Sequence, residues 1–113
     1  MDLLTILKVL AAVATIATGL LALIKPSAAY GFTGLSASGP RGVSEMRSNF
    51  GGLFIALGAA PLILGEVAYL VLGYGYLAIA AVRAFSIVFD RSYERSNLIS
   101  LGIEIVLGII LVI

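Results

Sequence analysis

The sequence contains no cysteine, no histidine and no tryptophan, and only 12% of its 113 residues are charged. Without cysteine the chain forms no disulfide, no thiolate metal site and no cysteine nucleophile. Without histidine it lacks the commonest general base and the commonest metal ligand. The formal net charge of +1 and the absence of a basic run argue against nucleic acid as a partner. We expect no metal and no cofactor.

Apolar residues, in contrast, make up 61% of the chain, and the mean hydropathy is +1.15. Average globular domains are about 45–50% apolar and about 25% charged. A soluble domain this short keeps a large share of its surface in water and cannot hide so many apolar side chains. The composition therefore predicts an integral membrane protein with a single domain, residues 1–113, whose partners include membrane lipids.

A helix needs about 20 apolar residues to cross about 30 Å of hydrocarbon. The sequence predicts an all-α, polytopic four-helix bundle with spans at about 3–24, 47–64, 67–89 and 98–113. The first span is longer than the apolar core of a signal peptide, which is about 7–15 residues. The apolar run 47–89 is twice the length of one span, so it must turn once. Gly65-Glu66 is the favoured turn, because Gly73-Tyr74-Gly75 would leave the third span too short.

Two connecting segments fall at the same end of the predicted bundle. Residues 27–45 are rich in glycine and predict a loop, with an interfacial turn around Tyr30, Phe32 and Leu35. Residues 90–96 carry four charges and predict a water-exposed turn. These segments and their borders hold most of the positive charge, namely Lys25, Arg41, Arg47, Arg91 and Arg95. Positive loops favour the cytoplasm, so we expect a multi-pass protein of the cell membrane with both long loops inside and both termini outside.

Arg83 and Glu104 are the most informative polar residues. Arg83 lies seven residues before Asp90, and Glu104 lies seven residues after Asn97. In an antiparallel hairpin these distances place both side chains at the same depth, about 10 Å inside the membrane. A single unpaired charge at the centre of a span costs about 2.5–3.5 kcal/mol. We therefore predict a hydrogen-bonded ion pair between the guanidinium and the carboxylate.

Two interpretations of this pair stand side by side. In one it only neutralises two charges and fixes the register of the helices. In the other it belongs to a polar pocket whose net charge with Arg47 is +1, which favours an anionic group of a lipid or small amphiphile. The candidate binding residues are Arg47, Asn49, Arg83, Ser86 and Glu104. The glycines of the spans are interpreted as helix-packing positions, and the candidates are Gly51, Gly52, Gly58 and Gly108.

Three short motifs resemble the signatures of a family of prokaryotic four-helix membrane proteins, the domain-of-unknown-function family 4345. They are Ser44-Glu45-Met46-Arg47 with Gly51-Gly52-Leu53 and Leu57-Gly58, then Val82-Arg83-Ala84-Phe85-Ser86, and finally Gly102-Ile103-Glu104-Ile105-Val106. The motifs occur in matching order over most of the chain. The resemblance implies a four-span fold and characteristic polar positions at Arg47, Arg83, Ser86 and Glu104, but it implies no activity.

No catalytic constellation is evident, because no histidine or lysine base accompanies the serines, and an enzyme is the least favoured class. Three functions remain open. The first is a module that binds a lipid or small amphiphile. The second is a structural or accessory subunit that packs against a membrane partner or a second copy of itself. The third is a small transporter coupled to ions through Glu104, although small multidrug transporters place their glutamate in the first span and carry tryptophan.

Overall fold

The computed structural model describes residues 1–113, apart from the side chains at positions 31 and 32. Within the described chain every regular element is helical. Four helices are long and apolar enough to cross a membrane, and they are Leu3–Ile24, Gly39–Leu64, Glu66–Phe89 and Arg95–Val112. The predicted all-α fold with four membrane-spanning helices is therefore confirmed, and it is the architecture of a multi-pass membrane protein.

Helix α1, Leu3–Ile24, is defined by a cap at each end. The Asp2 carboxylate accepts a hydrogen bond of 2.8 Å from the backbone N–H of Thr5, which satisfies a free donor of the first turn. This hydrogen bond holds the pKa of Asp2 below its usual value. The helix ends before Lys25-Pro26, because proline disfavours helical geometry in the residue before it.

The segment expected to be a loop, residues 27–45, contains three short helical elements instead. These are the 3₁₀ turn η1, Pro26–Ala29, and the helices α2, Tyr30–Thr33, and α3, Gly39–Glu45. Gly34 ends α2 with a φ of +75°. Of the predicted interfacial turn, the side chain of Phe32 lies outside the described residues, whereas Tyr30 and Leu35 are exposed.

The second span begins at Gly39 and not near Arg47 as the sequence suggested. Helix α3 continues without a break into the π-helical segment η2, Met46–Gly52, and into α4, Leu53–Leu64. Pro40 occupies the first helical turn, where its missing N–H has no cost. Glu45 then pairs with Arg41 one turn earlier and accepts a hydrogen bond of 2.7 Å from Asn49 one turn later. These contacts extend the helix through a polar stretch that hydropathy alone assigns to a loop.

The chain reverses after α4 at the predicted position. Gly65 has a φ of +87°, a left-handed value that side chains with a Cβ rarely adopt. Glu66 then opens α5, Glu66–Phe89, where a negative charge is favourable at the helix N-terminus. A second reversal at Asp90–Glu94 leads to α6, Arg95–Val112.

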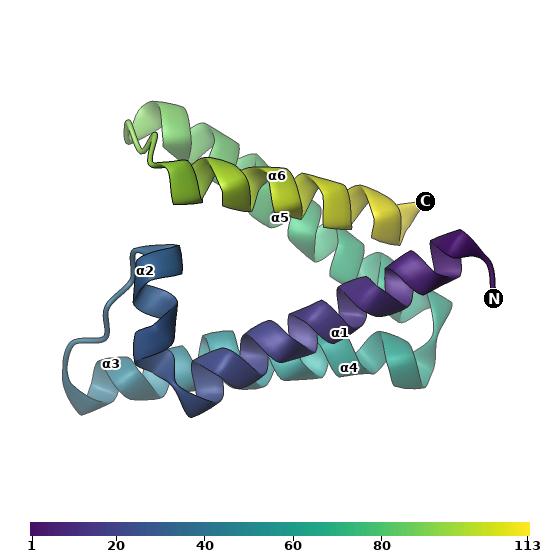
Figure 1. Cartoon of the computed structure of the whole chain (residues 1–113), viewed down its shortest axis with the longest axis horizontal. Helices are drawn as coiled ribbons and strands as arrows, with labels where there is room; N and C mark the ends of the chain where they lie inside the picture. The colour runs from purple at the N-terminus through teal and green to yellow at the C-terminus, as the bar shows by residue number, and fades with distance from the viewer.

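The four long helices form two antiparallel hairpins (Figure 1). Helix α1 packs along α4 and η2, and α5 packs along α6. The hairpins meet near the end that holds both termini and the turn at Gly65, and they diverge toward the end that holds the other two connections (Figure 1). The termini therefore share one side of the membrane, as an even number of spans requires.

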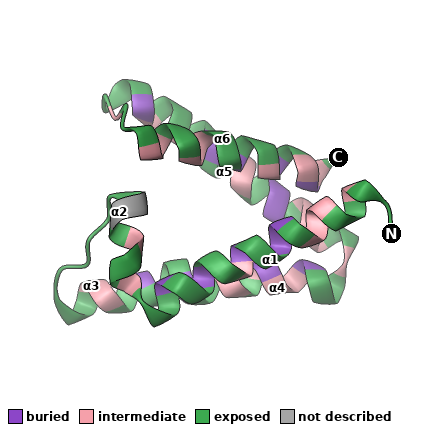
Figure 2. Cartoon of the chain, viewed as in Figure 1, coloured by how far each residue is buried: buried purple, intermediate pink, exposed green. Residues whose placement is uncertain are grey.

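Burial follows the two seams between paired helices (Figure 2). On α1 the buried residues are all small, and they are Ala11, Ala12, Thr15, Gly19 and Ala22. Large apolar side chains lie instead on the outer faces, where Ile63 is 79% exposed and Phe89 is 73% exposed. Lipid tails are as apolar as these side chains, so large apolar residues can lie on the outer faces. Small residues at the helix contacts let the helices pack closely, and this is the pattern expected of membrane helices.

Candidate functional site

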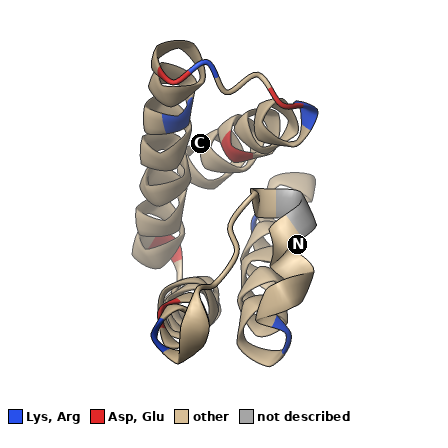
Figure 3. Ribbon diagram, turned by 90° about the vertical axis from the view of Figure 1, so that its left-hand side faces the viewer, with Lys and Arg blue, Asp and Glu red and all other residues tan. Residues whose placement is uncertain are grey.

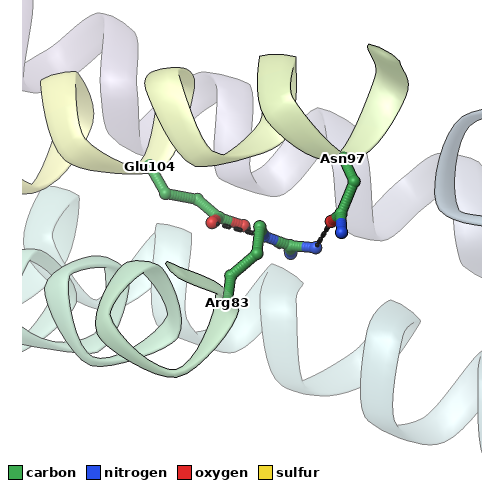
Figure 4. Close-up of polar contacts among 3 residues, drawn as sticks. All are labelled: Arg83, Asn97 and Glu104. Atoms are coloured by element: carbon green, nitrogen blue, oxygen red, sulfur yellow. Dashed lines mark hydrogen bonds and ion pairs between the residues drawn. The ribbon is translucent and has the colours of Figure 1, made fainter. Parts of the chain in front are cut away.

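The predicted ion pair between α5 and α6 is present (Figure 4). Arg83 Nε donates a hydrogen bond to Glu104 Oε1, and Arg83 Nη2 donates one to Glu104 Oε2, both over 2.7 Å. This two-pronged geometry matches a planar guanidinium to a planar carboxylate. The reversal ends at Glu94 and not at Ser96, so Arg83 lies seven residues before it and Glu104 lies ten residues after it, and the packing of the two antiparallel helices brings the side chains together. Most other charged residues lie at or near helix ends and in connections (Figure 3).

Asn97 binds the remaining guanidinium nitrogen of Arg83, Nη1. Its Oδ1 accepts a hydrogen bond of 2.8 Å from Arg83 Nη1 (Figure 4). The Asn97 amide is itself oriented by the turn, because Nδ2 donates to the backbone oxygen of Ser92 over 3.2 Å and to its hydroxyl over 3.0 Å. Asn97 was not among the candidate binding residues predicted from the sequence. Its spacing of seven from Glu104 on α6 was the signal that pointed to it.

Glu94 lies at the N-terminal boundary of α6. Its carboxylate accepts a hydrogen bond from the Ser92 hydroxyl, and this bond lowers the pKa of Glu94. Ser92 thus connects the solvent-exposed turn to Asn97 and, through Asn97, to the ion pair. The polar contacts run without interruption from Glu104 inside the span to the loop.

Arg83 is more exposed than its partner. The Arg83 side chain is 31% exposed, whereas the Glu104 side chain is 11% exposed. A guanidinium has five N–H donors, and three of them are used in the hydrogen bonds to Glu104 and Asn97. Two N–H groups of Arg83 are therefore free of partners among the described residues. They can still donate hydrogen bonds to a ligand.

A shallow, open groove of about 540 Å³ has Arg83 in its lining. Its lining consists of Ala78, Ile79, Val82, Arg83, Ser86 and Asn97. Along α5 the lining changes from apolar at Ala78 and Ile79 to polar at Arg83 and Ser86, in the direction of the loop. The Ser86 hydroxyl donates a hydrogen bond of 2.6 Å to Asp90 Oδ2, which leaves its oxygen able to accept one.

The structure does not bring all five candidate binding residues together. Arg47 lines a different groove, of about 470 Å³, which is formed by the connection after α1 and by α3 and η2. Asn49 faces Glu45, to which it donates a hydrogen bond. The combined charge of +1 that the sequence assigned to Arg47, Arg83 and Glu104 therefore does not belong to one lining, and the Arg83 groove is bounded by a neutral pair.

Tyr76 and Thr15 form a contact that the sequence did not predict. Their hydroxyl oxygens lie 2.5 Å apart and join α5 to α1, hence one hairpin to the other. Thr15 also donates to the backbone oxygen of Ala11 over 2.8 Å, so Tyr76 is the donor in the contact between the two hydroxyls. A tyrosine and a threonine in apolar spans are common, and nothing in their spacing pairs them across 61 residues.

Three of the four candidate packing glycines lie where helices approach closely. A Cβ on Gly58 would lie 2.7 Å from the Ala12 oxygen on α1, and one on Gly51 would lie 3.1 Å from Leu23 Cβ. A Cβ on Gly108 would lie 2.5 Å from Leu77 Cδ2 on α5. Gly52 differs, because a Cβ there would meet nothing within 4 Å. Next to Gly51 in the helix, it points away from α1 and contributes nothing to that contact.

Two further close approaches involve glycines that were not singled out for packing. A Cβ on Gly19 would lie 2.8 Å from the Gly51 oxygen, and one on Gly73 would lie 3.2 Å from the Gly108 oxygen.

Within the residues that the structure describes, no group of three acidic side chains could hold a metal ion.

Comparison with protein-family models, with curated proteins and with solved structures gave no match.

Proposed function

We propose that the protein binds a lipid or small amphiphile in the groove beside Arg83. The observation that carries this proposal is the change in the groove lining from apolar Ala78 and Ile79 to polar Arg83 and Ser86. An amphiphile lying along α5 would place its tail toward the membrane centre and its head toward the loop end. The groove has a volume of about 540 Å³ and is open along the surface of α5, so a bound amphiphile would remain partly in contact with the surrounding lipid.

The chemistry of the groove favours a head group that accepts hydrogen bonds. The two free N–H groups of Arg83 are donors, while Glu104 neutralises the guanidinium charge at 2.7 Å. An ester or amide carbonyl, or a phosphodiester oxygen, would satisfy these donors. In the low dielectric of the membrane, such a hydrogen bond is stronger than in water. The ion pair then has two roles, since it fixes the hairpin and presents donors to the ligand.

The test is to fill the groove without touching the ion pair. Val82→Trp places an indole in the groove, and Val106→Trp places one on the exposed surface of α6 as the matched control. Native mass spectrometry of the full chain, with phosphatidylethanolamine as the probe lipid, measures occupancy. We expect Val82→Trp to lower occupancy and Val106→Trp to leave it at the wild-type level. Equal occupancy in both variants contradicts the proposal.

The two alternative functions receive less support from the same contacts. A transporter coupled through Glu104 needs a carboxylate that exchanges ions or protons, but both Glu104 oxygens accept hydrogen bonds from Arg83. Persistence of flux through proteoliposomes in Glu104→Gln would remove that role altogether. An accessory subunit would use its glycine positions for a partner, whereas Gly58 and Gly108 lie in contacts within the chain. A monomer in detergent favours the binding module, and a stable larger complex favours the accessory subunit.

We also propose that the two positively charged connections face the cytoplasm. The positive charges gather at the end of the hairpins opposite the termini, which supports this orientation. Because the chain has no native cysteine, single cysteines at Ser36 and at Glu66 report the two sides without background. In intact cells an impermeant maleimide should label Glu66→Cys and not Ser36→Cys, and the reverse pattern would invert the topology.

A further inference from the structure

The groove that contains Arg47 is a second polar site, separate from the groove beside Arg83. It lies at the loop end of the α1–α4 hairpin, where the chain leaves α1 and enters α3. Its lining consists of Pro26, Ser27, Tyr30, Leu35, Ser36, Ala37, Val43 and Arg47. Nothing in the Arg83 site requires it, since the two linings share no residue.

Arg47 is the charged residue of this groove, and its guanidinium is not neutralised. It is exposed and has no hydrogen bond or ion pair with any residue that the structure describes. Arg41, on the same helix, is paired with Glu45. Lys25, the other cation of this hairpin end, immediately precedes the lining residue Pro26. The pairing of Arg41 with Glu45 thus leaves two uncompensated positive charges, Lys25 and Arg47, at this end of the molecule.

The neutral part of the lining suits an anion at a membrane surface. Ser27, Tyr30 and Ser36 supply hydroxyl groups, which can donate to anionic oxygens. Leu35 and Val43 supply apolar surface next to them. The groove lies beyond Ile24, where α1 ends, and therefore at the level where the hydrocarbon gives way to head groups. Arginine binds phosphate oxygens in a two-pronged geometry, and anionic lipids attract basic residues at this level.

Arg47 also lies in the π-helical segment η2, in which the Leu53 N–H donates to the Ser48 oxygen five residues earlier. Such segments widen a helix and occur frequently at functional sites. From the free guanidinium, the hydroxyl lining and the interfacial position together, we infer that this groove binds the phosphate of an anionic phospholipid. The phosphodiester would lie on Arg47, with Lys25 adding long-range attraction, and the glycerol region would contact Leu35 and Val43.

The test compares two arginines of equal charge on one helix. Arg47→Gln removes the guanidinium of the groove, and Arg41→Gln removes one that is exposed, paired with Glu45 and outside the lining. The full chain is titrated with phosphatidylglycerol and, separately, with phosphatidylcholine, and bound lipid is counted by native mass spectrometry. We expect a preference for phosphatidylglycerol that falls about fivefold in Arg47→Gln and stays near the wild-type value in Arg41→Gln. Arg47→Lys should retain part of the preference for phosphatidylglycerol.

Three outcomes would overturn the inference. Equal losses in Arg47→Gln and Arg41→Gln would mean that only net charge matters. Equal binding of phosphatidylcholine and phosphatidylglycerol to the wild-type chain would mean that the groove does not distinguish an anionic head group from a zwitterionic one, and the inferred preference for an anionic phospholipid would be wrong. Displacement of the lipid by inorganic phosphate alone would assign the groove to a free anion. The Val82→Trp variant separates the two proposals, because filling the Arg83 groove should leave the phosphatidylglycerol preference unchanged.

Discussion

The two hairpins of this protein are held together by different means. In the α1–α4 hairpin the contact is formed by small residues, and the backbones touch where Gly19 meets Gly51 and where Gly58 meets Ala12. In the α5–α6 hairpin close packing is confined to the region of Gly73 and Gly108. Nearer the loop, a charged network of Arg83, Glu104 and Asn97 takes its place.

The difference separates two kinds of contact between helices. A seam of small residues gains its energy from van der Waals contact and offers nothing polar to a ligand. An intramembrane ion pair gains little net stability over an apolar pair of the same volume, because desolvation offsets the attraction. It does keep donors and acceptors inside the membrane, where a ligand can reach them. The α5–α6 hairpin therefore holds the charged pair of the spans, whereas the buried residues that α1 contributes to the other hairpin are small and uncharged.

The largest effect is expected from Glu104→Ala. It leaves the Arg83 guanidinium without its counter-ion inside the span, at a cost of about 2–3 kcal/mol in the free energy of unfolding. This cost is lower than that of a fully buried unpaired charge, because Arg83 is 31% exposed and can turn toward the loop. The free energy of unfolding is measured by reversible unfolding of the full chain in mixed micelles. An effect below that of a surface substitution such as Val106→Ala would contradict this role.

The next effect is expected in the other hairpin, from Gly58→Ala. The added methyl would lie 2.7 Å from the Ala12 oxygen and 2.9 Å from the Ile16 nitrogen, and backbone atoms cannot move aside. We expect a loss of about 1–2 kcal/mol in the same unfolding experiment. Gly52→Ala is the matched control on the same span, and because its site is open it should leave stability unchanged or raise it slightly. If both variants behave alike, the small-residue seam is not what holds this hairpin.

A smaller effect is expected from Tyr76→Phe, which removes the hydrogen bond between the hairpins. Interhelical hydrogen bonds in membranes contribute about 0.6 kcal/mol on average, and Thr15 keeps its bond to Ala11 after the substitution. The more sensitive measurement is the distance between the hairpins, by spin labels on α1 and α6. We expect a broader distance distribution in Tyr76→Phe, and an unchanged one would show that the contact does not join the hairpins.

The smallest effect is expected at Asp2, where the hydrogen bond from Thr5 lowers the carboxyl pKa. A depressed pKa in the folded state means that the cap contributes above the unfolded pKa and is lost as the pH falls through the folded value. The protection factor of the Thr5 amide, which compares its exchange rate with the intrinsic rate at the same pH, should therefore fall only at acidic pH in the wild type. In Asp2→Ala the protection factor should be low at every pH, and continued protection of Thr5 would argue against the cap.

The hydrophobic pattern was sufficient to predict the number of long helices and the turn at Gly65. The ion pair was predicted by counting residues on both sides of the Asp90 turn, because helical rise is constant. The start of the second span could not be read from hydropathy, since Gly39–Glu45 is stabilised by Pro40 and by side-chain pairs of Glu45. The separation of Arg47 from Arg83 was also hidden, because it depends on how the two hairpins diverge.

The central claim is that Arg83 and Glu104 neutralise each other inside the α5–α6 hairpin. The most direct measurement is a double-mutant cycle of Arg83→Met and Glu104→Leu in reversible unfolding of the full chain. Each single variant should be destabilised, and the double variant should recover most of the loss, because no charge is then left alone in the span. Additive losses in the double variant would contradict the pairing on which the site depends.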